Sequence, residues 1–126
     1  KFSPSENRIC PVDIKTVNTI LYCKKWEETV AFYKTAIELP VIFSRDWFVE
    51  FKLGAMARLS VADEARASID SSDGKGITIS IEVDDVRVIR AYLASRGVNP
   101  TAIKHLWESQ VLYIYDPEGN RIEFWS

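Results

Sequence analysis

The sequence has little cysteine and little histidine, and the shortage of cysteine excludes two classes of protein. Its 126 residues include two cysteines, Cys10 and Cys23, and one histidine, His105. Two cysteines cannot build the disulfide framework of a small secreted domain, and their spacing matches no zinc motif. We therefore expect reduced thiols in a cytoplasmic protein, with Cys23 buried and inert. The lone histidine is expected at the surface, although it is the one side chain that titrates near neutral pH.

Charge and hydropathy exclude two further classes. The net charge is −2 and the basic residues are scattered, so the sequence gives no electrostatic basis for binding nucleic acid. No apolar run approaches the roughly 20 residues of a membrane-spanning helix, and we expect neither a signal peptide nor a membrane anchor. With 47% hydrophobic residues, the composition is that of one globular domain, enriched only in its four tryptophans.

Hydrophobic periodicity divides the chain into two similar halves. Residues 1–12 are polar, contain two prolines and predict a loose arm. Residues 13–62 predict, in order, a strand at 13–23, a helix at 26–39, and strands at 41–44, 47–53 and 56–62. A polar linker covers residues 63–75. Residues 76–126 repeat the plan with a strand at 77–83, a helix that Asp84 or Asp85 caps and Gly97 ends, a strand at 98–105 and a closing hairpin.

The closing hairpin gives the clearest local signal. Two alternating runs flank Asp116-Pro117-Glu118-Gly119-Asn120, hereafter the DPEGN turn. Proline presets φ, aspartate can hydrogen-bond forward to the turn, and glycine or asparagine accepts positive φ. Such a segment predicts a β-hairpin with a longer loop, in which Tyr113 lies opposite Glu123.

Spacing supports a duplication. Asn18 lies seven residues before Lys25 at the first junction of strand and helix, and Thr78 lies seven before Asp85 at the second. Gly54 and Arg58 are four residues apart, as are Gly119 and Glu123. Matching registers in both halves predict two copies of one unit, each with a strand, a helix and three strands.

This arrangement resembles the vicinal oxygen chelate superfamily, which groups glyoxalase I, bleomycin resistance proteins and extradiol dioxygenases. The segments that carry the resemblance are residues 30–33 (VAFY), 81–86 (IEVDDV) and 116–124 (DPEGNRIEF). The resemblance implies an α+β fold in which two βαβββ modules form a cupped, incomplete barrel-like sheet with helices outside. The single domain would cover residues 13–126, with modules at about 13–62 and 76–126 and the ligand inside the cup.

Metal-dependent members of that superfamily place a histidine on the first strand of a module and a glutamate on its last strand. By register the histidine positions fall on Asn18 and Thr78. The first glutamate position falls on Arg58, or on Ser60 if the hairpin slips by two residues, and only Glu123 remains. Amide and hydroxyl groups bind divalent transition metals poorly, so we expect no metal and no other cofactor.

Alternation predicts what faces the cup instead. We expect the ligand to contact residues from both modules: Asn18, Tyr22, Phe48, Arg58, Thr78, Tyr113, Arg121, Glu123 and Trp125. Aromatic walls with a few carboxylates suit an aromatic or cationic organic ligand. The resemblance to bleomycin resistance proteins, which bind their drug as dimers without chemistry, implies a metal-independent binding or sequestration protein that forms a homodimer. Whether modules pair within one chain or between two chains stays open.

Two other functions fit the same residues. A lyase, isomerase or dioxygenase would use Glu123, with Tyr113 or His105 assisting. A degenerate member would serve as an interaction module without a ligand. Glu123 could equally pair with Arg121 or Arg58, and Trp125 could form a cavity wall or a plug at the dimer interface. Trp26 is expected in the core, whereas Trp47 and Trp107 could form either a lid over the cup or ordinary surface.

Overall fold

The computed structural model describes residues 11–126, so Cys10 and most of the predicted arm lie outside the described residues. The elements follow in the order β1 (Val17–Cys23), α1 (Trp26–Ala31), the π-helical segment η2 (Phe32–Ala36), β2 (Val41–Arg45), β3 (Phe48–Lys52), β4 (Ala57–Asp63), β5 (Thr78–Glu82), α2 (Val86–Ser95), β6 (Lys104–Leu106), β7 (Ser109–Tyr115) and β8 (Arg121–Trp125). Across the described part of the chain, no helix is both long and apolar enough to cross a membrane.

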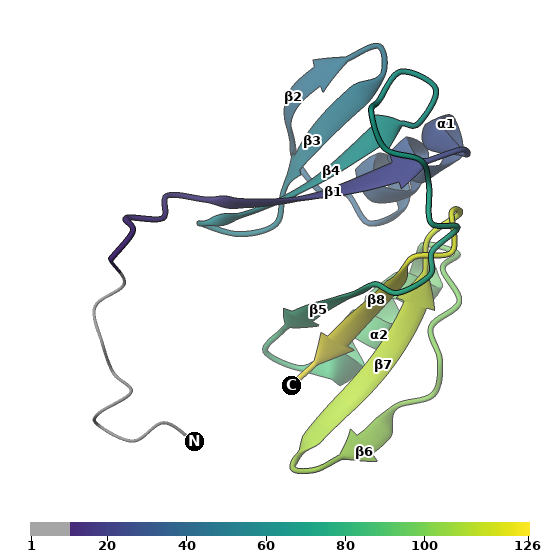
Figure 1. The fold of residues 1–126 in the computed structure, drawn as a ribbon. Helices are drawn as coiled ribbons and strands as arrows, with labels where there is room; N and C mark the ends of the chain where they lie inside the picture. Colours follow the sequence, from purple (N-terminus) through teal and green to yellow (C-terminus); the bar gives the residue numbers. More distant parts are fainter. Residues whose placement is uncertain (1–10) are drawn as a thin grey trace.

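The strands form two separate four-stranded sheets, one in each module (Figure 1). The orders are β1-β4-β3-β2 and β5-β8-β7-β6. In each sheet the first strand pairs in parallel with the last strand of its module, and the remaining pairs are antiparallel. The predicted α+β fold of two βαβββ modules is therefore confirmed, and the sheets do not close into a barrel.

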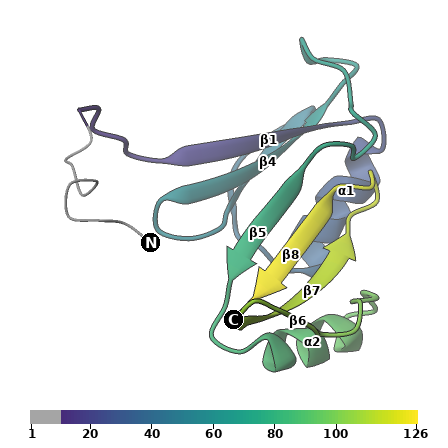
Figure 2. The same ribbon diagram turned by 60° about the horizontal axis from the view of Figure 1, so that its bottom comes forward.

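Alternation gives each sheet two different faces. The apolar face of the first sheet presents buried side chains that include Leu21, Phe51 and Leu59. The apolar face of the second presents Leu112, Ile114 and Ile122, and α2 packs on its β7 and β8 (Figure 2). We call the opposite faces, which carry Asn18 in the first sheet and Glu123 in the second, the polar faces.

The two helices end in different ways. Of the two predicted caps of α2, Asp84 and Asp85, the N-cap is Asp85, whose carboxylate accepts a hydrogen bond from the Arg87 amide. Gly97 follows the helix with a φ of 78°. The predicted helix at 26–39 is instead shorter and irregular. It ends as an α-helix at Ala31 and widens into η2, where the Ile37 amide donates to the Phe32 carbonyl across five residues.

One predicted strand is mostly absent. Residues 98–105 were expected to be extended, but only Lys104–Leu106 forms β6. Pro100 has no N–H to donate to a neighbouring strand, and the Thr101 amide makes a single ladder-like contact with the Tyr113 carbonyl, at 3.0 Å. The segment before β6, residues 98–103, therefore has no regular secondary structure.

The DPEGN turn connects the two modules. Asp116 accepts hydrogen bonds from the amides of Glu118 and Asn120, at 3.0 and 2.9 Å, as expected for a turn aspartate. Its other oxygen accepts from the Tyr33 hydroxyl, at 2.7 Å, across the module boundary. Burial, together with the neighbouring Asp116 carboxylate, raises the pKa of Tyr33 well above its ordinary value, so the phenol stays protonated as the donor.

Glu118 caps the first helix from the second module. The residue is only 8% exposed, and its two carboxylate oxygens accept from the amides of Lys24 and Lys25, each at 2.8 Å. Lys25 is the N-cap residue of α1 and provides no side-chain cap of its own. A carboxylate at this helix end satisfies free amides and interacts favourably with the helix dipole.

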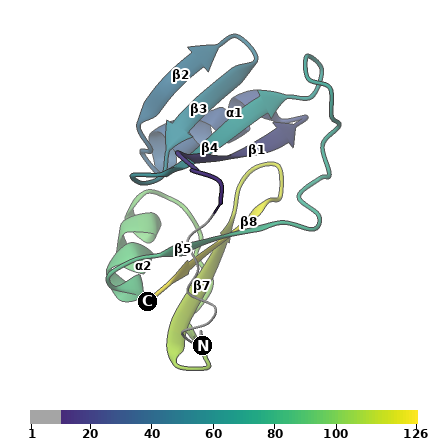
Figure 3. The same ribbon diagram turned by 60° about the vertical axis from the view of Figure 1, so that its left-hand side comes forward.

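The linker completes this contact. The Ser71 hydroxyl donates to Glu118, and Gly74 lies against Gly119. Figure 3 shows the course of the linker between β4 and β5. A Cβ added at Gly74 would lie 2.3 Å from backbone atoms of Gly119. Because no side chain fits in that space, glycine is required at position 74 for the linker to reach the turn.

Cys23 lies beside this network and is fully buried. Desolvation by burial raises the pKa of its thiol to about 12, and the carboxylates of Glu118 and Asp116 add to the shift. A thiol with such a pKa is rarely ionised near neutral pH, so the expected buried, inert cysteine is confirmed.

Candidate ligand-binding site

A pocket of about 330 Å³ lies on the polar face of the second sheet. This volume is in the range of small-molecule sites, which is on the order of 300–1,000 Å³. Side chains from the second module line it: Ser80, Leu106, Trp107, Ser109, Val111, Glu123 and Trp125. The closing hairpin has the expected register, with Tyr113 opposite Glu123 and Val111 opposite Trp125. The pocket therefore has apolar and aromatic walls around one carboxylate.

Among the described residues, Glu123 is the only ionisable side chain that lines the pocket. Its carboxylate accepts a hydrogen bond from the Ser80 hydroxyl on the adjacent parallel strand. Within residues 11–126, none of the ion pairs involves Glu123. The alternative pairings with Arg121 and Arg58 are therefore wrong, and the charge of Glu123 has no basic counterpart in the described residues.

The two arginines have other partners. Arg58 lies 3.5 Å from Glu50 in a half-buried ion pair on the first sheet. Arg121 donates to the Thr78 hydroxyl at 2.9 Å, and its guanidinium lies 4.5 Å from the centre of the Tyr113 ring. Tyr113 and Thr78 lie on the predicted face, but their contacts with Arg121 place them in a cluster beside the pocket lining.

Trp107 is the most unusual residue of the pocket. Its side chain is 100% exposed, and it follows β6 in the two-residue turn before β7. Its backbone has a φ of 55°, a left-handed conformation that bulky residues adopt rarely and that glycine adopts freely. A large apolar side chain is thus kept in solvent, at a backbone cost, in the lining of a pocket that also contains Trp125 and Glu123. Sequence patterns predicted a lid or ordinary surface at this position without showing this strain.

The pairing of the strands shows whether Arg58 or Ser60 is the first-module equivalent of Glu123. Lys25 and Asp85 are the two helix N-caps, so Asn18 and Thr78 are equivalent, each seven residues earlier. Asn18 pairs with Arg58 and Thr78 with Arg121. Two residues further along, Ser60 is therefore the equivalent of Glu123. Ser60 is fully buried and donates to the Asn18 side-chain oxygen at 2.8 Å.

This donor set does not fit a divalent transition metal. The four equivalent positions hold an amide, two hydroxyls and one carboxylate: Asn18, Ser60, Thr78 and Glu123. Zinc and similar divalent transition metals bind through imidazole, thiolate and carboxylate groups. This set contains one such group, the carboxylate of Glu123. Residues 11–126 contain no group of three or more histidine, cysteine or acidic side chains placed to hold a metal ion.

The predicted ligand contacts form two separate groups. Asn18, Tyr22, Phe48 and Arg58 lie on the polar face of the first sheet, and the other five lie on that of the second: Thr78, Tyr113, Arg121, Glu123 and Trp125. Of these nine, only Glu123 and Trp125 line the pocket. His105 lies exposed on β6 outside the lining, as expected for a surface histidine, and Trp26 packs against the core.

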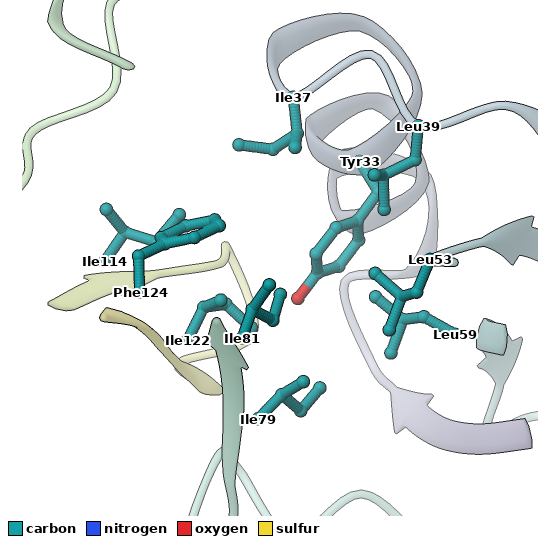
Figure 4. Close-up of a pocket in the computed structure, with 10 residues that line it drawn as sticks. All are labelled: Tyr33, Ile37, Leu39, Leu53, Leu59, Ile79, Ile81, Ile114, Ile122 and Phe124. Atoms are coloured by element: carbon teal, nitrogen blue, oxygen red, sulfur yellow. The ribbon is translucent and has the colours of Figure 1, made fainter. Parts of the chain in front are cut away.

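The modules of one chain face each other with their apolar sides. A cavity between them is lined from the first module by Leu53 and Leu59 and from the second by Ile79, Ile122 and Phe124, among others (Figure 4). Because side chains alternate along a strand, the polar faces must point away from this contact. A single chain therefore leaves both polar faces open and forms no cup between them.

Comparison with known proteins agrees with this fold. A family model described as the glyoxalase/bleomycin resistance protein/dioxygenase superfamily matches residues 15–124. No match to a curated protein sequence was found. A lactoylglutathione lyase from Agrobacterium tumefaciens is similar in structure, with a TM-score of 0.71 and 20% identity over 86% of this chain and 90% of the other.

Two further structures share the fold. The antibiotic-binding protein TnmS3 from Streptomyces sp. CB03234 has a TM-score of 0.72 and 18% identity, covering 93% of this chain and 97% of the other. A glyoxalase/bleomycin resistance protein/dioxygenase from Nocardioides has a TM-score of 0.74 and 18% identity, covering 96% and 87%. With the family match over residues 15–124, the chain belongs to the glyoxalase/bleomycin resistance protein/dioxygenase superfamily.

Proposed function

We propose that the chain is a metal-independent protein that binds or sequesters an aromatic, cationic small molecule. The observation that carries the proposal is the setting of Glu123 in a pocket walled by Trp107 and Trp125. Among the described residues, this carboxylate has no basic partner. Aromatic faces and a carboxylate both attract an organic cation, and the tryptophans add apolar contact area. The structural likeness to an antibiotic-binding protein supports a binding role.

The binding site is completed by a second copy of the chain. One copy offers two open polar faces, and within residues 11–126 the outer edges of β1 and β5 have no partner strand. Val17, at the start of β1, is 59% exposed. Unpaired edges and exposed apolar side chains favour association. In the proposed dimer, the first module of one copy covers the pocket of its partner and brings Tyr22 and Phe48 toward the ligand.

The enzyme alternative has less support in this site. Glu123 is the only titratable group in the lining, and His105 lies outside it. General acid–base catalysis of the kind expected for a lyase or isomerase needs a proton donor and acceptor positioned on one substrate. A second such group is not among the described lining residues.

Titration calorimetry with ethidium and bleomycin tests the proposal. We expect saturable binding with one ligand per pocket, weakened by salt and by the variant Glu123→Gln because the ligand's charge loses its counterpart. Sedimentation at micromolar concentration should show a dimer. The proposal would be contradicted if neither probe bound saturably. It would also be contradicted if a monomeric form of the protein bound a probe as tightly as the native protein does.

Trp107→Gly separates binding from folding. Glycine relieves the left-handed backbone at this turn, and the side chain buries nothing within one chain. We expect an unfolding free energy equal to or above that of the native protein, together with about tenfold weaker ethidium binding from the lost aromatic contact. The matched control is Ile69→Ala, an exposed apolar residue of the linker. Unchanged affinity in Trp107→Gly would remove this residue from the site.

A further inference from the structure

The cavity between the modules is separate from the proposed ligand pocket. It has a volume of about 100 Å³ and is lined by Tyr33, Ile37, Leu39, Leu53, Leu59, Ile79, Ile81, Ile114, Ile122 and Phe124. On β8, Ile122 and Phe124 face this cavity, whereas Glu123 between them faces the ligand pocket. On β5, Ile79 and Ile81 flank Ser80 in the same way. The two spaces therefore lie back to back across one sheet.

The lining side chains offer a ligand no free hydrogen-bond donor. Nine of the ten lining side chains are aliphatic or phenylalanine, and the tenth is Tyr33. The Tyr33 hydroxyl already donates to Asp116 at 2.7 Å, so its proton is not available to a ligand, and its ring lies among the lining side chains (Figure 4). In the described residues no buried side-chain nitrogen or oxygen lacks a hydrogen-bond partner. Five of the ten lining residues are partly exposed, and the lining side chains offer a water molecule fewer than the two to four partners that it needs.

We infer that this cavity is a second binding site, which takes a compact apolar molecule the size of a monocyclic aromatic hydrocarbon. Apolar cavities of similar size, about 150 Å³, stay dry and bind benzene or xenon. The occupant would contact both modules at once, since Tyr33 and Leu59 lie on one side and Ile114 and Phe124 on the other. Its binding would therefore stabilise the packed arrangement of the modules by mass action.

Benzene is the probe for this site. We expect saturable benzene binding, and shifts in the NMR signals of the Ile79, Ile81 and Leu59 methyl groups when benzene is added to the dimer. Ile79→Phe should fill the cavity and abolish binding while the protein stays folded, and Leu53→Phe offers the same test from the other module. Glu123→Gln should bind benzene like the native protein, because its side chain lies on the opposite face.

The outcomes separate the two sites. Loss of benzene binding in the filled variants, with ethidium binding retained, supports a distinct apolar site. Benzene binding that persists in both filled variants, or no saturable binding by the native protein, overturns the inference and leaves the proposed function untouched. Xenon density in a pressurised crystal gives an independent check, and density only at the protein surface would also overturn the inference.

Discussion

Asp116→Ala is expected to destabilise the protein by about 3 kcal/mol, which corresponds to a fall in Tm of roughly 10 °C. The substitution removes a buried carboxylate that accepts from the Tyr33 hydroxyl, the Asn120 side chain and two turn amides. Those donors stay buried without a partner, and each such loss is costly. Denaturant unfolding followed by circular dichroism measures the effect.

Two variants define the origin of that loss. Tyr33→Phe removes only the hydrogen bond that Asp116 accepts from the first module and should cost about 1 kcal/mol. Asp70→Ala changes an exposed aspartate of the linker and should leave the unfolding free energy within about 0.5 kcal/mol of the native value. If Asp116→Ala unfolds at the same denaturant concentration as Asp70→Ala, the DPEGN turn does not hold the modules together.

Glu118→Gln is expected to cost about 2 kcal/mol at neutral pH, with a loss that shrinks in acid. Burial pushes the pKa of Glu118 upward, but hydrogen bonds from Ser71, Lys24 and Lys25 together outweigh it, and the pKa lies below its ordinary value of 4.5. The ionised carboxylate therefore stabilises the folded state fully above about pH 4.5. This contribution is lost as the pH falls through the lower pKa of the folded state.

Unfolding measured as a function of pH tests this assignment. The difference in free energy between the native protein and Glu118→Gln should be constant above pH 5 or so and decline below it, because the folded-state carboxylate then takes up a proton. Glu28→Gln, at an exposed position in the first turn of α1, is the control and should show no such decline. A difference that is independent of pH would show that the Glu118 charge does not cap α1.

Local chemistry explains which parts of the fold could be predicted from sequence. Asp85 at a helix N-cap and Gly97 after the helix carry their structural preference in their own side chains, and both occur where expected. The DPEGN turn is also local, and so is the alternation that pairs Tyr113 with Glu123. These features need no knowledge of distant residues.

The features that were missed depend on residues far apart in sequence. The sequence indicated only a turn position for Glu118, whereas its carboxylate binds the amides of Lys25 and Lys24, which are 93 and 94 positions away. Tyr33 lies in η2, the widened end of the first helix, and its contact with Asp116 spans 83 positions, so periodicity alone gives no sign of either feature. The equivalence of Ser60 and Glu123 also required the paired strands, because a slip of two residues keeps the same face.

A mixing experiment tests the shared ligand site most directly. Tyr22→Ala alters the polar face of the first module and Trp107→Gly that of the second, so each variant alone should bind ethidium weakly. When the two are unfolded and refolded together, half of the dimers are mixed, and each mixed dimer has one intact site. About a quarter of all sites should therefore regain native affinity. Affinity in the mixture no better than in either variant alone would contradict a site built from two copies of the chain.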